Sequence, residues 1–154
     1  MPMTEQQHAY VDRVATYFSI LGSSRAWSEI LAWLMICDPP HQSQAQIQES
    51  LSLSAGTVST QLRSLVEIEF AEPVRLQGER VQYYRLRPGA WQRVMTSEMG
   101  RIAALKELAI AGEDVLPAER PERITELRAV AEFFEREWPS LLARMNESLE
   151  KGTP

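Results

Sequence analysis

Residues 43–86 read SQAQIQESLSLSAGTVSTQLRSLVEIEFAEPVRLQGERVQYYRL, and this stretch decides the fold. Its first part predicts two helices, at about 43–51 and 54–70, with Ser43 and Ser54 placed to cap them. Leu53 lies in the short turn between them, and two helices joined by such a turn form a helix-turn-helix unit. The apolar residues expected to face inward are Ala45, Ile47, Leu51, Val58, Leu62, Leu65 and Ile68.

The pattern then changes from helical spacing to two strand-like runs. Residues 74–77 and 80–86 are separated by Gly78-Glu79, and a two-residue Gly-X link suits a tight type II′ hairpin turn. We therefore expect a β-hairpin wing directly after the helix-turn-helix. The residues whose strand parity allows them to face the core are Tyr84 and Leu86 in one strand and Val74 and Leu76 in the other.

Helices are also predicted before this stretch. Thr4 can cap a first helix that ends at Leu21, with Gly22 as its stop. Ser23 or Ser24 can begin a second helix, which the Asp38-Pro39-Pro40 segment ends because proline cannot continue a helix.

Two long helices are predicted after the wing. The first runs from Ala90 to Ala111 and closes at Gly112. The last has Pro121 in its first turn and is expected to be kinked or interrupted at Pro139.

The predicted fold class is mainly α with a small β-hairpin wing, a winged helix-turn-helix with long N- and C-terminal helices. We predict three regions along the chain: an N-terminal helix in residues 1–22, the winged helix-turn-helix in residues 23–88, and a C-terminal helical region in residues 89–154.

The composition is that of a globular protein. The 154 residues are 44% hydrophobic and 24% charged, which argues against disorder. No apolar run approaches the roughly 20 residues that span a bilayer. The first five residues lack the pattern of a signal peptide. We therefore expect a cytoplasmic protein with no membrane partner.

The sequence contains no arrangement of residues typical of catalysis or metal binding. Cys37 lies in an apolar stretch and is interpreted as a small buried hydrophobe in preference to a redox sensor. His8 and His41 have no Cys or His neighbours. Neither a Ser-His-Asp or Cys-His grouping nor a glycine-rich phosphate loop is present. We expect no enzyme, no metal site and no cofactor.

The outward face of the second helix of the helix-turn-helix is suited to DNA. This helix enters the major groove in such units. Small hydroxyl side chains allow close approach to phosphates, and Gln and Arg can pair with bases. The alternative is an ordinary solvated polar face, which usually mixes Glu and Lys, and this face has no acid before Glu67. The candidate DNA-binding residues are Ser54, Thr57, Ser59, Thr60, Gln61, Arg63 and Ser64.

The distribution of charge favours DNA although the chain has a net charge of −5. Residues 75–87 hold four arginines against Glu79, a net charge of +3, whereas residues 113–154 hold ten acidic and six basic side chains, a net charge of −4. Arg80 follows the hairpin turn, from which a flexible tip can reach the minor groove. Arg75 and Arg85 are placed to contact phosphates, as is Arg87.

The chain resembles the MarR-type winged-helix regulators, and more closely their GbsR-like branch, over about residues 10 to 110. The most specific matching segments are residues 54–59 (SAGTVS) and 80–86 (RVQYYRL), accompanied by residues 17–25 (YFSILGSSR) and 36–40 (ICDPP). Two features differ from the family pattern. Glu69-Phe70 stands where the family usually has Gly and a hydrophobe, and Ala55 stands where many members have an arginine.

The resemblance implies a homodimer in which the first helix and the two C-terminal helices interleave. These helices also carry more large apolar residues than one small domain easily buries. The candidate dimerisation residues are Phe18, Leu105, Leu108, Phe134, Trp138 and Leu141. A two-fold dimer predicts a pseudo-palindromic operator on double-stranded DNA.

The resemblance further implies a small-molecule effector between the DNA-binding domain and the dimer helices. Aromatic faces can hold a quaternary ammonium, although aromatic residues at helical spacing are more often plain core. The candidate pocket residues are Tyr10, Tyr17, Trp27, Trp33 and Trp91.

The function that the sequence favours is a DNA-binding transcriptional regulator, and we expect it to act as a repressor. We assign DNA binding to residues 23–88, and dimerisation to the N-terminal helix in residues 1–22 and the C-terminal helical region in residues 89–154. The alternative is a winged-helix protein-interaction module that does not bind DNA.

Overall fold

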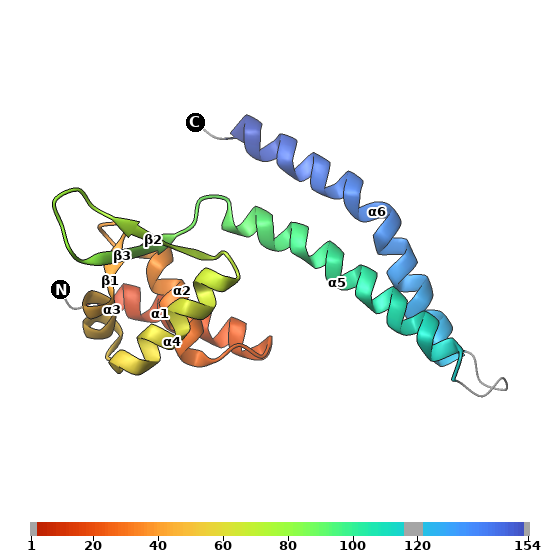
Figure 1. Cartoon of the computed structure of the whole chain (residues 1–154), viewed down its shortest axis with the longest axis horizontal. Coiled ribbons are helices and arrows are strands. Elements are labelled where there is room, and N and C mark those ends of the chain that lie inside the picture. Colours follow the sequence, from red (N-terminus) through yellow and green to blue (C-terminus); the bar gives the residue numbers. More distant parts are fainter. Residues whose placement is uncertain (1–2, 116–121, 153–154) are drawn as a thin grey trace. The chain divides into compact units, whose positions relative to one another are not determined.

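The computed structural model describes residues 3–115 and 122–152, so Pro121, expected in the first turn of the last helix, lies outside the described residues. The chain divides into two compact units, Met1–Ala90 and Trp91–Pro154. Within the described ranges, no helix combines the length and the apolar character needed to cross a membrane. The elements of the first unit are α1 (Glu5–Ile20), α2 (Arg25–Ile36), β1 (Gln42–Ser43), α3 (Gln44–Leu51), α4 (Ala55–Glu67), β2 (Ala71–Arg75) and β3 (Gln82–Leu86) (Figure 1).

The first two helices begin and end as the sequence predicts. The Thr4 hydroxyl accepts a hydrogen bond from the Gln7 amide at 3.2 Å, and the Gln7 side chain accepts one from the Thr4 amide at 2.8 Å. Gly22 has a φ of +90°, the left-handed conformation that ends a helix. Ser24 caps α2 by accepting from the Trp27 amide at 3.2 Å. These predictions are confirmed.

Helix α2 forms the centre of the first unit. It packs against α1, α3, α4 and β3. Ile30, Leu31 and Ala32 are completely buried. A helix buried on most of its sides has to be apolar nearly all round, and the α2 sequence RAWSEILAWLMI meets that condition.

The helix-turn-helix is confirmed with two corrections to its inward face. In α3 the Ser43 cap is present, but Ala45 is exposed and Ser50 is buried. Helix α4 ends at Glu67, not Phe70, and Ile68 is 49% exposed. The physical reason is that Glu69 takes a φ of +62°, which turns the chain out of the helix and carries Phe70 into the core. Glu69 therefore occupies the left-handed position where the family usually has glycine.

The wing is part of a three-stranded antiparallel sheet with the order β1-β3-β2. The predicted two-residue hairpin is wrong, because the last strand pair is Arg75 with Gln82 and residues 76–81 form a longer loop. Val74 pairs with Tyr83 while Pro73 pairs with Tyr84. Directly paired residues share a face, so Val74 and Tyr84 lie on opposite faces and cannot both face the core.

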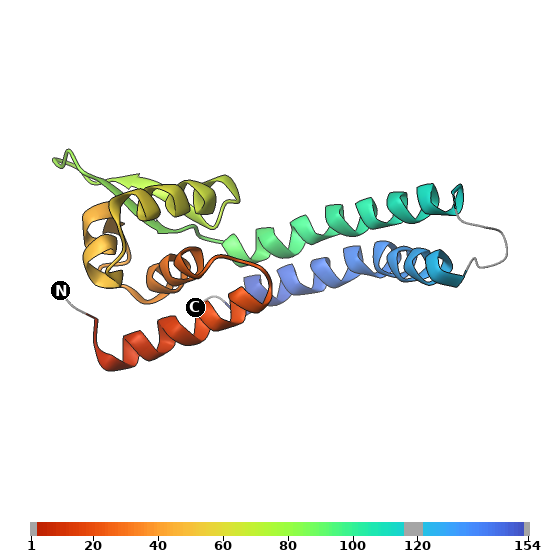
Figure 2. The same ribbon diagram turned by 90° about the horizontal axis from the view of Figure 1, so that it is seen from below.

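The second unit is an antiparallel hairpin of α5 (Ala90–Glu113) and α6 (Glu122–Gly152), which Figure 2 shows side by side. Side chains join the two helices at several levels. The Lys106 ammonium lies 2.7 Å from a Glu135 carboxylate oxygen, and an Arg128 guanidinium nitrogen lies 2.6 Å from Glu113. The Trp138 indole donates to the Met95 carbonyl at 3.3 Å.

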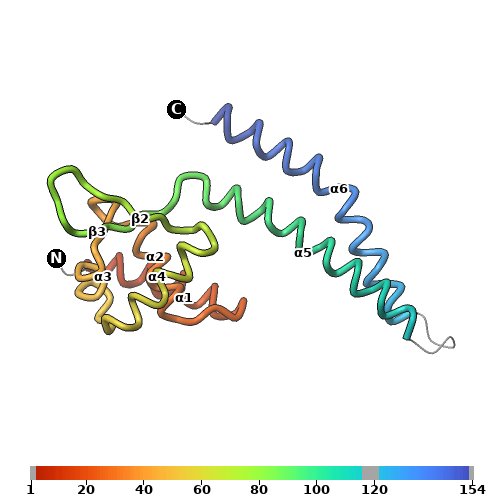
Figure 3. Tube along the Cα trace, viewed as in Figure 1, coloured from red at the N-terminus to blue at the C-terminus, as the bar shows by residue number. Residues whose placement is uncertain are grey.

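One expectation about these helices is corrected, and for the other the structure decides between its two alternatives. Gly112 does not close α5, which continues to Glu113. A side-chain carbon at Gly112 would lie 3.0 Å from Ile124 Cδ1, so glycine allows the close approach of α6 here. Pro139 lies inside α6 without interrupting it, and the traced helix bends along its length (Figure 3). The predicted fold class, mainly α with a small wing, is confirmed.

Candidate nucleic-acid interface

Helix α4 presents a clear division between a buried and an exposed side. Val58, Leu62 and Leu65 are buried against the rest of the unit. Gly56, Thr60, Arg63 and Glu67 are exposed at intervals of four, three and four residues, which places them along one face. Glu67, at the C-terminal end, is the only acidic residue in this exposed stripe. The part of the face formed by Gly56, Thr60 and Arg63 is therefore neutral or basic.

The remaining candidate residues of α4 lie on its flanks. Ser54 is exposed, but its hydroxyl caps the helix, accepting from the Thr57 amide at 3.2 Å and lying 2.8 Å from the Thr57 hydroxyl. The Gln61 amide oxygen accepts a hydrogen bond from the Ser24 hydroxyl at 3.4 Å, so it is turned partly towards α2. Thr57, Ser59, Gln61 and Ser64 are all half-buried.

The wing arginines fall into two groups. Arg75 and Arg80 are exposed and have no acidic partner in the part of the chain that the structure describes. Arg85 holds Glu72 with two nitrogens at 2.6 and 2.7 Å. Arg87 lies 3.1 Å from a Glu69 oxygen. The positive charges of Arg75 and Arg80 are therefore available to a ligand, whereas those of Arg85 and Arg87 are largely balanced by nearby carboxylates.

Sequence reasoning missed the balancing acids because they lie outside residues 75–87. Glu72 faces Arg85 directly across the β2–β3 ladder. Opposite charges in directly opposed positions of an antiparallel pair attract each other. A two-residue turn at Gly78-Glu79 already places residue 72 opposite residue 85, but the predicted strand begins at Val74 and leaves Glu72 outside it, whereas β2 begins at Ala71.

The structure separates the residues proposed to line an effector pocket. Tyr10 and Tyr17 line one hollow of about 370 Å³ on α1 and α2, together with Arg13, Phe18 and Met35. Trp27 lines a second hollow of about 310 Å³ beside α4. Two other candidates lie elsewhere: Trp33 is buried and Trp91 belongs to the second unit. Tyr10 and Tyr17 therefore line one hollow together, whereas Trp27 lines a different one.

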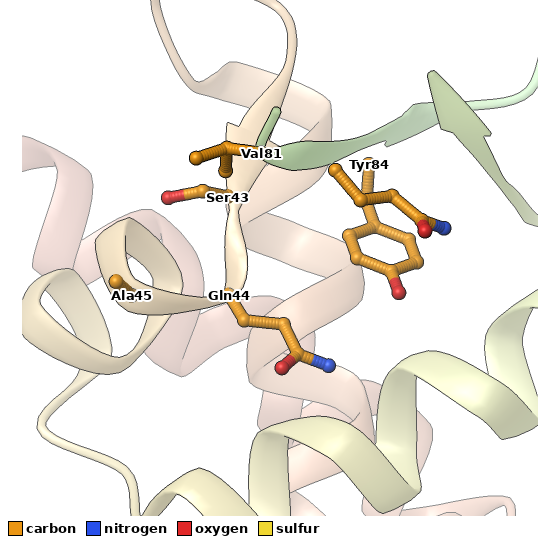
Figure 4. A pocket seen from close by; sticks show the side chains of 6 residues that line it. Ser43, Gln44, Ala45, Val81 and Tyr84 are labelled. Carbon is orange, nitrogen blue, oxygen red and sulfur yellow. The ribbon is translucent and has the colours of Figure 1, made fainter. Parts of the chain in front are cut away.

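A further hollow of about 390 Å³ lies at the foot of the wing and contains none of the proposed effector residues. Figure 4 shows its lining, which comes from β1, the start of α3, and β3 with the residue before it. The lining residues are Ser43, Gln44, Ala45, Val81, Gln82 and Tyr84.

The candidate dimerisation residues differ in exposure. Leu108 is 65% exposed, and Leu105, Phe134 and Leu141 are also exposed. Trp138 is half-buried in the α5–α6 hairpin through its bond to Met95. Phe18 packs edge-on against Trp27, with ring centroids 5.7 Å apart, inside the first unit. Exposed leucine and phenylalanine on a two-helix hairpin leave an apolar surface that a partner can cover.

Cys37 is buried, and burial raises the pKa of its thiol to about 11. Only the thiolate is nucleophilic, so we expect iodoacetamide to modify Cys37 much more slowly in the folded chain than in urea at pH 8. The raised pKa also means that the thiol's contribution to stability is complete below the unfolded pKa of about 9 and is lost as the pH rises through 11. Mass spectrometry of the alkylated chain measures the rates, and equal rates in both states would contradict the burial.

Comparison with known proteins places this geometry in a family. Residues 89–148 match the family described as "MmpR5-like MarR family transcriptional regulator". The chain is 30% identical over 141 residues to the HTH-type transcriptional regulator MmpR5 of Mycobacterium tuberculosis (strain ATCC 25618 / H37Rv), across 90% of this chain and 86% of that one. A solved structure titled "Crystal Structure of a transcriptional regulator" superposes with a TM-score of 0.77 at 30% identity, covering 92% of this chain and 99% of that one.

The chain belongs to the MarR family. The family match falls on α5 and most of α6, whereas the resemblance in the sequence rested mainly on the helix-turn-helix and the wing. Both ends of the molecule therefore point to MarR-type regulators. This is a family of DNA-binding transcriptional regulators and is generally non-enzymatic.

Proposed function

We propose that this chain is a sequence-specific transcriptional repressor that acts as a homodimer on a pseudo-palindromic operator. The observation that carries the proposal is the exposed, acid-free part of α4 together with arginines that have no acidic partner among residues 3–115 and 122–152. Arg63 stands in the middle of the α4 stripe, and Arg75 and Arg80 stand on the wing. Cations without a protein partner are free to neutralise phosphates and release the counterions bound to them.

The candidate residues take different parts in this proposal. Thr60 and Arg63 are placed to meet base edges, because they lie at the centre of the exposed face of α4. Ser54 and Thr57 order the start of the helix, where free backbone amides can meet a phosphate. Ser59, Gln61 and Ser64 contribute from the flanks, and Arg85 contributes least because Glu72 already holds it.

The homodimer is supported by the family and by the second unit. MarR-type regulators act as dimers. The exposed apolar residues of α5 and α6 exceed what an isolated helical hairpin usually presents to water. A two-fold axis would place two copies of α4 in successive major grooves, about 34 Å apart. In this proposal, residues 1–22 and 89–154 form the dimer contacts and residues 23–88 bind DNA.

Selection of genomic fragments by the purified protein tests this function. Enrichment of fragments that share an inverted repeat, followed by repression of a reporter placed behind that repeat, is the expected result. The rival function is a protein-interaction module. Failure of the protein to be retained on random duplex or heparin at low ionic strength would favour that rival and end the proposal.

Single arginine substitutions should distinguish a contact with a specific base from a contact that depends only on charge. Arg63→Ala should weaken specific binding by about 1–3 kcal/mol if Arg63 pairs with guanine. Arg80→Ala should weaken binding to all duplexes and reduce the slope of log K against log salt by about one. Fluorescence anisotropy across a salt series measures both.

Arg101→Ala is the matched control for these variants. Arg101 is exposed on α5 and paired with Glu98 at 3.0 Å, outside the proposed interface. Its replacement should leave affinity unchanged. If Arg63→Ala and Arg80→Ala bind as the Arg101 variant does, the assignment of these two residues fails.

We also propose a ligand response and a GbsR-like placement within the family, which rest on the motifs in residues 17–25 and 80–86 and on the tyrosine hollow. Tyr10 and Tyr17 offer aromatic faces to a quaternary ammonium in a space of about 370 Å³. Titration of the protein–DNA complex with choline or betaine tests this, and an affinity for DNA that stays constant at millimolar ligand would reject both.

A further inference from the structure

The wing loop, residues 76–81, is exposed and depends on few contacts. Residues 77–81 are all exposed. Gly78 has a φ of +85°, and the Glu79 amide donates to the Leu76 carbonyl at 3.1 Å, which closes one turn inside the loop. Such a loop, with most of its backbone in solvent, opens at low cost unless a side chain ties it down.

Within the described ranges, one side-chain hydrogen bond ties this loop to the sheet. The Tyr83 hydroxyl donates a hydrogen bond to the Glu79 carboxylate. Tyr83 belongs to the central strand, where it is paired with Val74 on one side and Ser43 on the other. Its ring meets His41 edge-on, with centroids 5.2 Å apart and planes at 90°. The anchor is therefore a side chain held by both neighbouring strands and by an aromatic contact.

The anchored group is the one acid in the wing's basic segment. Glu79 is the only acidic residue between Glu72 and Glu98, and it stands next to Arg80. If the carboxylate were free, it would be within reach of the neighbouring arginine and would also repel phosphates. The hydrogen bond from the Tyr83 hydroxyl is charge-assisted, and it gives the Glu79 carboxylate a partner on the sheet. The same bond raises the pKa of the Tyr83 phenol, so the phenol remains a donor.

We propose that Tyr83 is a positioning residue for DNA binding: it holds the Glu79 carboxylate against the sheet, which keeps the wing loop in one conformation and leaves Arg80 unpaired for DNA. This inference rests on the proposed function. It assigns a role to two residues that do not themselves need to touch the duplex. It also explains why an acid is tolerated beside the arginine at the wing tip.

A double-mutant cycle on duplex binding tests the inference. Tyr83→Phe removes only the hydroxyl and should weaken binding by about three- to tenfold, the range expected from the net contribution of a typical hydrogen bond. In a Glu79→Ala background the same substitution should have no effect, because the hydroxyl no longer has a carboxylate to hold. Tyr84→Phe is the matched control. The Tyr84 hydroxyl makes no hydrogen bond within the described part of the chain, so its removal should leave affinity unchanged.

Limited proteolysis gives a second readout that needs no DNA. Trypsin cleaves after arginine, and Arg80 lies in the loop. Tyr83→Phe should speed cleavage after Arg80 several-fold, while Tyr84→Phe should not. The inference would be overturned if the effects of Tyr83→Phe and Glu79→Ala on binding were additive, or if Tyr83→Phe left cleavage after Arg80 unchanged. In either case, wild-type binding to DNA would still support the proposed function. A wild-type protein that bound no duplex would overturn both.

Discussion

Replacing Leu62 by alanine should lower the free energy of unfolding of the first unit by about 2–5 kcal/mol. Leu62 is 1% exposed and lies on the inner face of α4, which packs on α2, α3 and β2. Alanine removes three carbon atoms and leaves a cavity that close-packed neighbours only partly fill. Because the unfolding free energy of a domain is itself about 5–15 kcal/mol, a loss of this size takes away a large share of the stability.

Urea denaturation followed by tryptophan fluorescence measures this loss. Trp27 and Trp33 are buried in the first unit, so their emission reports on the packing around α2. Thr60→Ala is the control, since Thr60 is exposed on the same helix and its replacement should change stability by less than about 0.5 kcal/mol. A Leu62→Ala chain as stable as the Thr60→Ala chain would show that α4 does not pack as described.

The helix starts could be predicted from the sequence because each depends on residues close together in the chain. Ser24, Ser43 and Ser54 each accept a hydrogen bond from the backbone amide three residues on. Such a cap needs no information from distant elements. The order of the helices follows from these starts, which is why the fold class was predicted correctly.

The ends of the elements were predicted less well because they depend on tertiary contacts. Helical periodicity alone would continue α4 to Phe70, but burying Phe70 in the core requires the chain to leave the helix at Glu69. A non-glycine residue at a φ of +62° carries a backbone cost that sequence patterns give no reason to expect. The Arg87 guanidinium lies 3.1 Å from the Glu69 carboxylate at this turn.

The electrostatic detail of the candidate interface could not be read from the sequence. Strand β1 is only two residues long, and it pairs with β3 some 40 positions further on. The pairing of Glu72 with Arg85 needs a strand that begins at Ala71, whereas the predicted strand begins only at Val74 and leaves Glu72 outside it. The sequence therefore predicted four available wing arginines, whereas the structure leaves Arg75 and Arg80 without an acidic partner in the described ranges.

Replacing Leu108 by glutamate should convert the proposed dimer to a monomer and lower affinity for a two-site operator by about 10²–10⁴-fold. The Leu108 side chain on α5 is 65% exposed. The α5–α6 hairpin of a single copy can therefore tolerate a polar side chain at this position. A carboxylate without a partner cannot enter an apolar interface without a large desolvation penalty. Two copies that no longer associate bind the two half-sites independently. They therefore lose the increase in affinity that comes from binding both half-sites as one dimer.

Sedimentation equilibrium at micromolar concentration and anisotropy on full and half-site duplexes measure the two effects. The matched control is Ala103→Glu, an exposed position on α5 five residues earlier, which points to a different side of the helix. Its replacement should keep the dimer and the affinity. Since Leu108→Glu alters neither α4 nor the wing, the monomer should still bind a half-site duplex as weakly as one wild-type subunit would. A Leu108→Glu chain that sediments as a dimer and binds the full operator like wild type would place the dimer contact elsewhere on the molecule.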